Sequence, residues 1–210
     1  MNPLLRCSLV YLTTGKKFGI SKNTLQHMHT HSFSRLNNND DLNVNWTSKL
    51  DTNNHVNQTS FLSWNILSQN LFDSTPKWYM HVKSEVPVSW VKRFPRIVSE
   101  ILESGADVVC LQEVEFTAYE KDFQSTMYDN GYSSLMQKSS RKRAEEGGYG
   151  VATFWRKDRF QLRDSIHRSR TMVTILSDVL NPGSCLAVIN CHLEGHPEKS
   201  LVRVRQLQRW

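Results

Sequence analysis

The pattern of hydrophobic and polar positions divides the chain near Ser60. Residues 1–59 contain runs of Asn, and their apolar stretch at 9–12 is short and not repeated at strand or helix spacing. A segment of this kind cannot bury enough apolar surface to fold. From residue 60 onward, apolar runs of strand length alternate with amphipathic helical patterns. The sequence therefore predicts a disordered, basic, Asn-rich leader over 1–59 and a folded domain over 60–210.

The folded part begins with a strand, a helix and a second strand. Residues 60–67 are apolar and short enough for a buried strand. Apolar residues then recur at helical spacing over 94–102, with Pro95 expected in or near the first turn and Gly105 just past the end. The run at 107–111 predicts the second strand, which ends at the polar pair Gln112 and Glu113.

The remaining pattern is mostly strand. A short helix is expected over 119–128, and the last predicted element is a helix over 202–210. The expected strands between them cover 132–136, 150–155, 160–162, 171–179 and 185–191. A strand, a helix and a strand followed by hairpins predict an α/β sandwich with mixed sheets.

Composition narrows the class of protein. The 210 residues leave room for one domain of ordinary size. Lys and Arg number 26 against 20 Asp and Glu, and the net charge of +6 favours polyanionic partners such as nucleic acid or anionic lipid. Mean hydropathy is −0.50, and no stretch approaches the roughly 20 apolar residues of a membrane helix, so we expect no membrane span. The 4 cysteines lack C-x-x-C spacing, which favours a reducing compartment.

The beginning of the leader is free of acidic residues. No Asp or Glu precedes Asp40, whereas basic residues, Ser and Thr recur. This composition suits an organelle transit peptide, and a low-complexity leader is the alternative interpretation. We therefore expect the protein in the cytoplasm or the mitochondrion.

Three polar residues stand at the ends of apolar strands, where open α/β sheets commonly carry their sites. The Asn65 amide can orient a phosphate oxygen or a nearby carboxylate, or it can satisfy neighbouring backbone. The Glu113 carboxylate is a suitable hard ligand for Mg²⁺, or a solvated strand end. The His192 imidazole can donate to a phosphoryl oxygen that gains charge in a transition state, or it is structural.

Basic residues form two clusters that can track a phosphate backbone. The first contains Lys138, Arg141, Lys142 and Arg143, from which we take Arg141 as a substrate contact. The second contains Arg156, Lys157, Arg159, Arg163, Arg168 and Arg170. Tyr149 or Trp155 is available for base stacking. The alternative interpretation of both clusters is a solvated charged face.

Taken in order, these motifs resemble the endonuclease/exonuclease/phosphatase superfamily, in particular its deadenylase-like branch. W-N-I-L at 64–67 is similar to the first-strand motif of that branch. A-D-V-V-C-L-Q-E-V at 106–114 is similar to the strand whose Glu is the magnesium ligand. N-C-H-L at 190–193, with Pro197 five residues after the histidine, is similar to the segment whose His and Pro contact substrate. The resemblance covers about residues 60–210.

This resemblance implies a four-layer α/β/β/α sandwich with mixed sheets, of which the chain would hold the amino-terminal half. It also implies a Mg²⁺-dependent phosphodiester hydrolase, with Mn²⁺ as an alternative ion, that acts on RNA as a 3′ exonuclease or deadenylase. Glu113 would hold the metal, Asn65 would position the phosphate or its neighbours, and His192 would donate to a non-bridging oxygen. Pro197 and Asn190 would contribute to substrate binding.

The sequence departs from the family pattern at its end. Members of the family continue into a strand ending in Gly-Asp-Phe/Leu-Asn and finish with Ser-Asp-His, and neither motif occurs here. Because residues of a catalytic constellation act as a unit, we expect the 210-residue chain alone to be nearly inactive. Two alternatives stay open: a catalytically dead fragment or half-domain that binds RNA or a partner, and a phosphatase of the same superfamily that acts on a small phosphorylated substrate.

Overall fold

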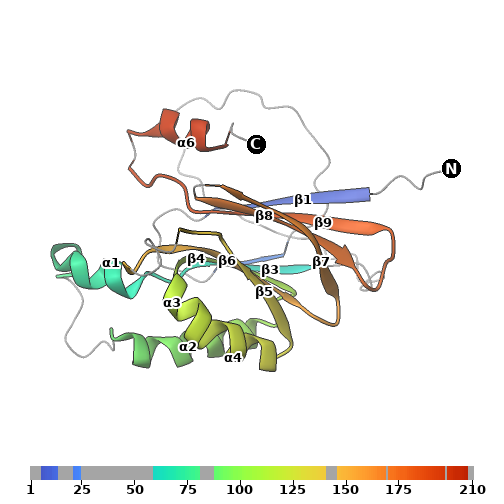
Figure 1. Cartoon of the computed structure of the whole chain (residues 1–210), viewed down its shortest axis with the longest axis horizontal. Helices are drawn as coiled ribbons and strands as arrows, with labels where there is room; N and C mark the ends of the chain where they lie inside the picture. Colours follow the sequence, from blue (N-terminus) through green and yellow to red (C-terminus); the bar gives the residue numbers. More distant parts are fainter. Residues whose placement is uncertain are drawn as a thin grey trace.

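Two mixed β-sheets stacked face to face form the centre of the molecule (Figure 1). The computed structural model describes residues 6–13, 21–24, 59–80, 88–140, 146–168, 170–196 and 198–207. Its strands are β1 (Arg6–Thr13), β2 (Ser21–Thr24), β3 (Ser60–Asn65), β4 (Val108–Glu115), β5 (Tyr132–Met136), β6 (Tyr149–Arg156), β7 (Phe160–Arg168), β8 (Thr171–Asp178) and β9 (Ser184–Cys191). One sheet has the order β2-β3-β4-β6-β5, and the other has the order β1-β9-β8-β7.

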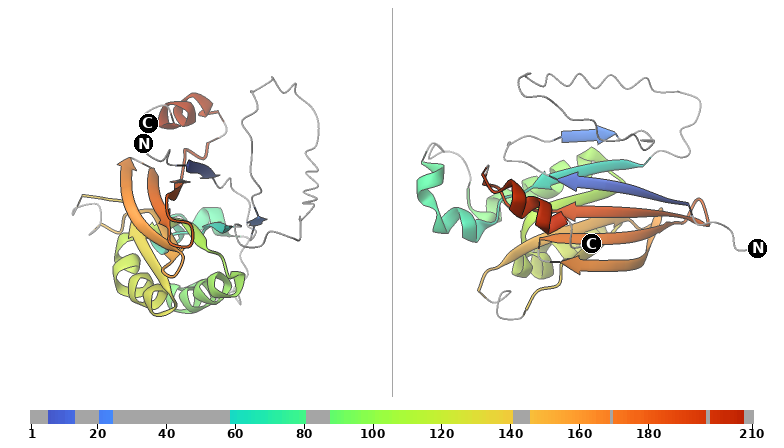
Figure 2. Two further views of the ribbon diagram at one scale, coloured as in Figure 1. Left: turned by 90° about the vertical axis from the view of Figure 1, so that its right-hand side faces the viewer. Right: turned by 90° about the horizontal axis from the view of Figure 1, so that it is seen from above.

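Helices cover the outer side of the five-stranded sheet. The helical elements are α1 (Gln69–Ser74), the 3₁₀ helix η2 (Pro76–Tyr79), α2 (Trp90–Ser104), α3 (Phe116–Ala118), the π-helix η3 (Tyr119–Phe123), α4 (Gln124–Asp129) and α6 (Ser200–Leu207). Helices α2, α3 and α4 lie on one side of the five-stranded sheet, the four-stranded sheet lies on the other, and α6 lies beyond the four-stranded sheet (Figures 1 and 2). The prediction of a mixed α/β fold with two sheets is confirmed.

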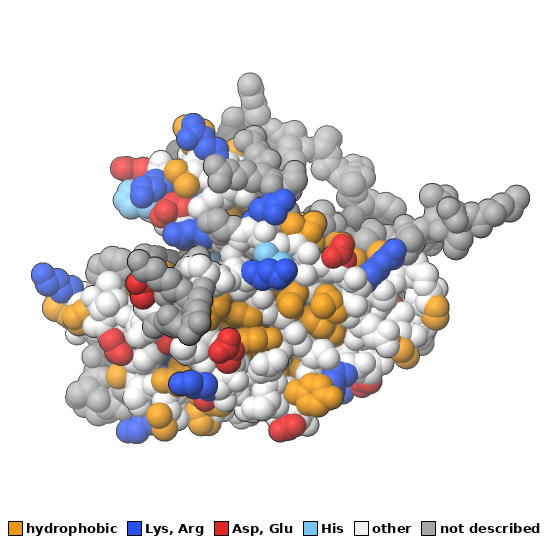
Figure 3. Space-filling view, in the orientation of Figure 1, with side chains coloured by type: hydrophobic (Ala, Val, Ile, Leu, Met, Phe, Trp, Pro, Cys, Tyr) orange, Lys and Arg blue, Asp and Glu red, His pale blue; other side chains and the backbone are white. Residues whose placement is uncertain are grey.

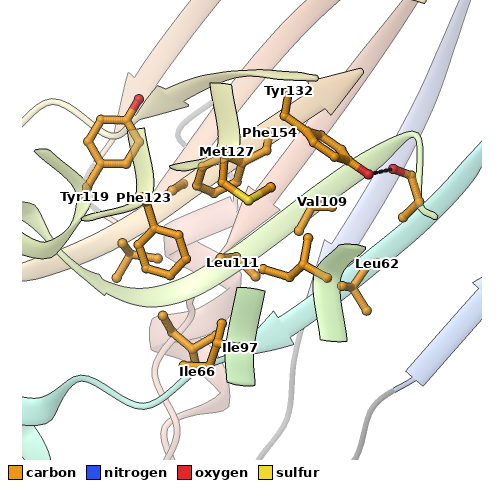
Figure 4. Close-up of a cluster of buried hydrophobic side chains, with 14 residues drawn as sticks. Leu62, Ile66, Ile97, Val109, Leu111, Tyr119, Phe123, Met127, Tyr132 and Phe154 are labelled. Atoms are coloured by element: carbon orange, nitrogen blue, oxygen red, sulfur yellow. Dashed lines mark hydrogen bonds between the residues drawn. The ribbon is translucent and has the colours of Figure 1, made fainter. Parts of the chain in front are cut away.

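Strand β4 is buried on both faces and joins two hydrophobic clusters. Val109 and Leu111 pack in the cluster beneath the helices, whereas Val108 and Cys110 pack in the cluster between the sheets. Figure 4 shows the first cluster, where the Tyr132 hydroxyl donates to the carbonyl of Ala106 at 2.7 Å. A strand buried in this way reads as a continuous apolar run, which is why its sequence predicts it so clearly.

Helix α2 begins one turn earlier than its apolar pattern predicts. Its first residue is Trp90, so Pro95 lies inside the helix rather than in the first turn. Pro95 is on the exposed side, where the carbonyl that loses its usual donor can bond to water. The end of the helix agrees with the prediction, because Gly105 adopts a left-handed φ of +59° and its N–H donates to the carbonyl of Leu102.

Two strands lie within the segment predicted as a disordered leader. Strand β1 pairs in parallel with β9, and β2 pairs antiparallel with β3. The apolar residues of 9–12 suit a strand, and the edge of β9 offers backbone groups that need partners. Residues 1–5, 14–20 and 25–58 of the predicted leader lie outside the described residues.

The described surface carries charges of both signs. On the face shown in Figure 3, basic, acidic and hydrophobic side chains are interspersed. Within the described ranges, no helix has both the length and the apolar character needed to cross a membrane.

Candidate active site

A bulge in β4 aims Glu113 at the candidate site. Regular alternation would place Glu113 on the helix-covered face with Val109 and Leu111, but the register against β6 shifts between Gln112 and Val114. Val114 occupies the helix-covered face instead and joins the same cluster as Leu111. Glu113 has a φ of +58°, a conformation that residues with a side chain rarely adopt. Backbone strain at a carboxylate is typical of a functional position.

Asn65, at the end of β3, directly contacts this carboxylate. Its Nδ2 donates to Glu113 Oε1 at 2.7 Å, and its Oδ1 accepts the N–H of Leu67 at 3.0 Å. The backbone N–H of Ser68 donates to Glu113 Oε2 at 3.3 Å. Both carboxylate oxygens therefore receive a hydrogen bond, one from the last residue of β3 and one from the turn that follows it.

His192 approaches Glu113 from the second sheet. Its Nε2 lies 3.4 Å from Glu113 Oε1, and its backbone N–H donates to the carbonyl of Arg170 at 2.8 Å. Burial lowers the pKa of His192, while the charge of Glu113 partly opposes this and Arg170 reinforces it. The lowered pKa favours the neutral form of the imidazole. The structure thus brings together all three residues predicted as catalytic.

The carboxylate fits the requirements of a magnesium ligand. A carboxylate has about four lone-pair positions, and the bonds from Asn65 and Ser68 leave some of them available. Asn65 turns a donor toward Glu113, so its amide orients the carboxylate and is not a metal ligand in this arrangement. Mg²⁺ usually keeps several waters and binds through one or two carboxylates plus substrate phosphate. Among the described residues, no group of three His, Cys, Asp or Glu side chains forms a ready metal site.

Asn190 does not reach the candidate site surface. Its side chain is completely buried between the sheets, where Nδ2 donates to the carbonyls of Leu111 at 3.2 Å and Ala152 at 2.9 Å. Its Oδ1 accepts from Gln112 Nε2 at 2.8 Å. The prediction that Asn190 binds substrate is therefore corrected: β9 points this residue inward, and its amide ties the two sheets together. Pro197 and Arg141, the other predicted substrate contacts, lie outside the described residues.

The second basic cluster is divided between opposite ends of the sandwich. Arg156 pairs with Asp158, and Arg159 pairs with Asp107 at 2.7 Å, at the end where β4 begins. Arg168 and Arg170 instead lie at the end that carries His192. Of the cations in this cluster, Arg170 lies close enough to His192 for its charge to act on the imidazole.

Of the two aromatic residues predicted to stack on a base, only Tyr149 lies near His192. Trp155 is only 3% exposed and packs between the sheets, so the structure contradicts its proposed role in base stacking. Tyr149 lies at the start of β6, and its ring centre is 6.1 Å from that of His192. Tyr79 was not predicted as a site residue, yet burial and then the charge of Glu113 raise the pKa of its phenol. Neither Tyr79 nor the backbone donor Ser68 has a sequence signature, because their places depend on the path of the chain after β3.

Comparison with known proteins identifies the family of this chain. Residues 62–210 match the model of the Endonuclease/Exonuclease/phosphatase family. The chain belongs to this family. Similar members include Protein angel homolog 2 of Mus musculus, 28% identical over 165 residues that make up 70% of this chain and 29% of the relative. The CCR4-Not complex 3′-5′-exoribonuclease subunit Ccr4 of Kluyveromyces lactis is 33% identical over 134 residues, 58% of this chain and 17% of the relative.

Solved structures of family members share the fold. The crystal structure of ANGEL2, a 2′,3′-cyclic phosphatase, aligns with a TM-score of 0.61 and 27% identity, covering 70% of this chain and 44% of that one. The human Nocturnin catalytic domain aligns with a TM-score of 0.54 and 22% identity, covering 71% and 56%. The resemblance to the deadenylase-like branch is therefore confirmed. The chain spans less than a third of the length of the curated relatives named here.

Proposed function

We propose that this chain forms part of the active site of a Mg²⁺-dependent phosphodiester hydrolase that acts on RNA, as a 3′ exonuclease related to deadenylases. The observation that carries the proposal is the convergence of Asn65, Glu113 and His192 from three strands of two sheets. These side chains combine a metal-binding carboxylate, a group that fixes it and a neutral donor. That combination suits hydrolysis at a phosphate.

Each residue has a definable task. Glu113 would hold Mg²⁺, which when bound neutralises phosphate charge and activates water. Asn65 holds the carboxylate in place through its 2.7 Å hydrogen bond. His192 would donate its N–H to a non-bridging oxygen as that oxygen gains charge. Arg168 and Arg170 would attract neighbouring phosphates, and Tyr149 would stack on a base.

A second candidate is hydrolysis of a terminal or cyclic phosphate. It is supported by the likeness to the structure of ANGEL2, a 2′,3′-cyclic phosphatase. Glu113 and His192 would serve either reaction, because each reaction develops negative charge on oxygens bound to one phosphorus. Hydrolysis of a small phosphorylated substrate and a purely RNA-binding role are the remaining alternatives. For the location of the protein, the cytoplasm or the mitochondrion stays a prediction from the leader.

The test uses the protein encoded by the longest transcript, with oligo(A) RNA ending in either a 3′-hydroxyl or a 2′,3′-cyclic phosphate. We expect Mg²⁺-dependent shortening from the 3′ end, and we expect Glu113→Gln to lower kcat/KM by about 10²-fold or more. Glu120→Gln removes an exposed carboxylate from η3 and should leave the rate unchanged.

The other outcomes of this assay distinguish the alternative functions. Opening of the cyclic phosphate without shortening would favour the second candidate. Binding of RNA without hydrolysis of either substrate would favour the RNA-binding role. Equal rates for the wild type and Glu113→Gln would remove Glu113 from the mechanism. The same assay on residues 1–210 alone tests the expected near-absence of activity.

A further inference from the structure

The turn that follows β3 is bonded to an arginine of α2. Arg93 directs Nη2 to the carbonyl oxygens of both Ile66 and Leu67, the latter at 2.6 Å. Its Nη1 donates to Gln69 Oε1 at 3.1 Å. One planar guanidinium therefore bonds to the turn through Nη2 and to the first residue of α1 through Nη1, whereas a Lys ammonium has a single nitrogen.

The conformation of the turn requires such support. Two successive carbonyls of an extended strand point to opposite sides, and they meet one guanidinium here because the chain bends at Leu67. Leu67 has a φ of +60°, in the left-handed region that side-chain-bearing residues rarely adopt. Conformations of this kind persist where the surroundings fix them, and Nη2 of Arg93 supplies two of the fixing contacts.

The same turn determines where the Glu113 carboxylate lies. Ser68, directly after Leu67, gives its N–H to Glu113 Oε2 at 3.3 Å. The N–H of Leu67 occupies Asn65 Oδ1, which leaves the amide donor of Asn65 facing Glu113 Oε1. Both oxygens of the carboxylate thus depend on groups whose positions are set by the bend at Leu67.

We propose that Arg93 is a positioning residue for the Glu113 metal site and acts on it through the turn at 66–68. The inference rests on the proposed function of Glu113 as a metal ligand. Arg93 itself need not contact the ion or the substrate. The charge of Arg93 alone does not account for the role, because the contacts use two nitrogens of a rigid plane: Nη2 bonds to the carbonyls of Ile66 and Leu67, and Nη1 bonds to Gln69.

The test measures Mn²⁺ binding to the full chain by the electron paramagnetic resonance signal of the free ion. Arg93→Ala should weaken Mn²⁺ binding by about tenfold or more, as loss of an orienting partner does at metal sites. Guanidinium chloride, below concentrations that unfold the protein, should restore part of the affinity, whereas equal NaCl should not. Arg96→Ala changes an exposed arginine of the same helix and should bind Mn²⁺ like the wild type.

If Arg93→Ala does not fold, Arg93→Lys provides the test. The lysine keeps the charge but has one nitrogen in place of Nη1 and Nη2, so it cannot hold the turn and Gln69 together. We expect weaker Mn²⁺ binding at an unchanged melting temperature, together with faster hydrogen exchange in the peptide 66–70. Wild-type affinity in folded Arg93 variants, or a loss that guanidinium does not restore in Arg93→Ala, overturns the proposal. Unchanged binding in Glu113→Gln would instead show that the proposed metal function has failed, and the positioning role with it.

Discussion

Asn65 Nδ2 lies 2.7 Å from Glu113 Oε1, although the two residues are 48 positions apart in the chain. The contact forms because β3 and β4 are parallel neighbours in which Asn65 is opposite Gln112, and because the bulge after Gln112 turns Glu113 toward the end of β3. The direction of the hydrogen bond is fixed, since Asn65 Oδ1 already accepts the N–H of Leu67. Asn65 is therefore built to present a donor to the carboxylate.

Replacement of Asn65 should weaken the site without unfolding the protein. Asn65→Ala removes the donor that orients Glu113, and partners of this kind are typically worth about 10–100-fold in metal affinity or activity. Mn²⁺ titration of the wild type and the variant measures the effect. Asn181→Ala, in the exposed turn before β9, is the control and should bind like the wild type. Equal Mn²⁺ affinity for Asn65→Ala and the wild type would contradict the orienting role.

Asn190 should matter for stability rather than for substrate binding. Asn190→Leu keeps the approximate volume but withdraws the donor from the carbonyls of Leu111 and Ala152 and the acceptor from Gln112. Loss of a partner for a buried polar group costs about 1–3 kcal/mol. Urea denaturation should therefore show a free energy of unfolding lower by about that amount. An unchanged free energy of unfolding in Asn190→Leu would contradict the stabilising role of this amide.

The sequence predicts those parts of the fold in which burial dominates. Five predicted elements are present in the structure: β4, β6, β8, β9 and α2. Each packs against a hydrophobic core, where burial of apolar residues is favourable. Strand β7 extends to Arg168, well beyond the predicted 160–162, since most of its side chains are polar and exposed. Its place is set by backbone pairing with β8, which a hydrophobic pattern does not record.

The candidate site is predictable in its members but not in its geometry. Three strand ends bring Asn65, Glu113 and His192 together, as the positions of the polar residues suggest. The bulge at Glu113 has no sequence signal, because glutamate does not favour a positive φ. The inward direction of the Asn190 side chain is also not predictable from the sequence. A buried amide is favourable only where hydrogen-bond partners are in position, and here they lie on β4 and β6.

Tyr149 should distinguish a substrate with bases from one that offers only phosphate. Stacking of a base on an aromatic ring contributes about 1–3 kcal/mol, so Tyr149→Leu should weaken binding of oligo(A) by about tenfold. An abasic oligomer of the same length should bind the variant and the wild type equally, and Tyr149→Phe should keep the affinity. Fluorescence anisotropy with labelled oligomers measures both.

A matched control for this prediction exists on another surface. Tyr128 is 59% exposed and lies against Lys157, just beyond the end of β6 that is remote from Tyr149. Tyr128→Leu should therefore leave oligo(A) binding unchanged. A parallel loss of oligo(A) and abasic binding in Tyr149→Leu would refute stacking and point to a general disturbance of the site.

Stability should fall as the pH drops below neutrality, and His167 should contribute to this slope. Burial lowers the pKa of His167 from its ordinary value of 6.5, and the charge of Lys138 lowers it further. Its Nδ1 accepts the backbone N–H of Lys138 at 3.1 Å, an interaction available only to the neutral ring. The unfolded chain therefore binds the proton more readily than the folded protein, so the stabilisation is complete above pH 6.5 and is lost as the pH falls toward the folded pKa.

Urea midpoints measured from neutral to mildly acidic pH test this prediction. His167→Gln cannot take up the proton, so its midpoint should fall less steeply with decreasing pH than that of the wild type. The slope should be reduced rather than abolished, because the lowered pKa of His192 acts in the same direction. Identical slopes for the two proteins would show that protonation of His167 costs the folded state nothing, and its hydrogen bond to Lys138 would then be dispensable for stability.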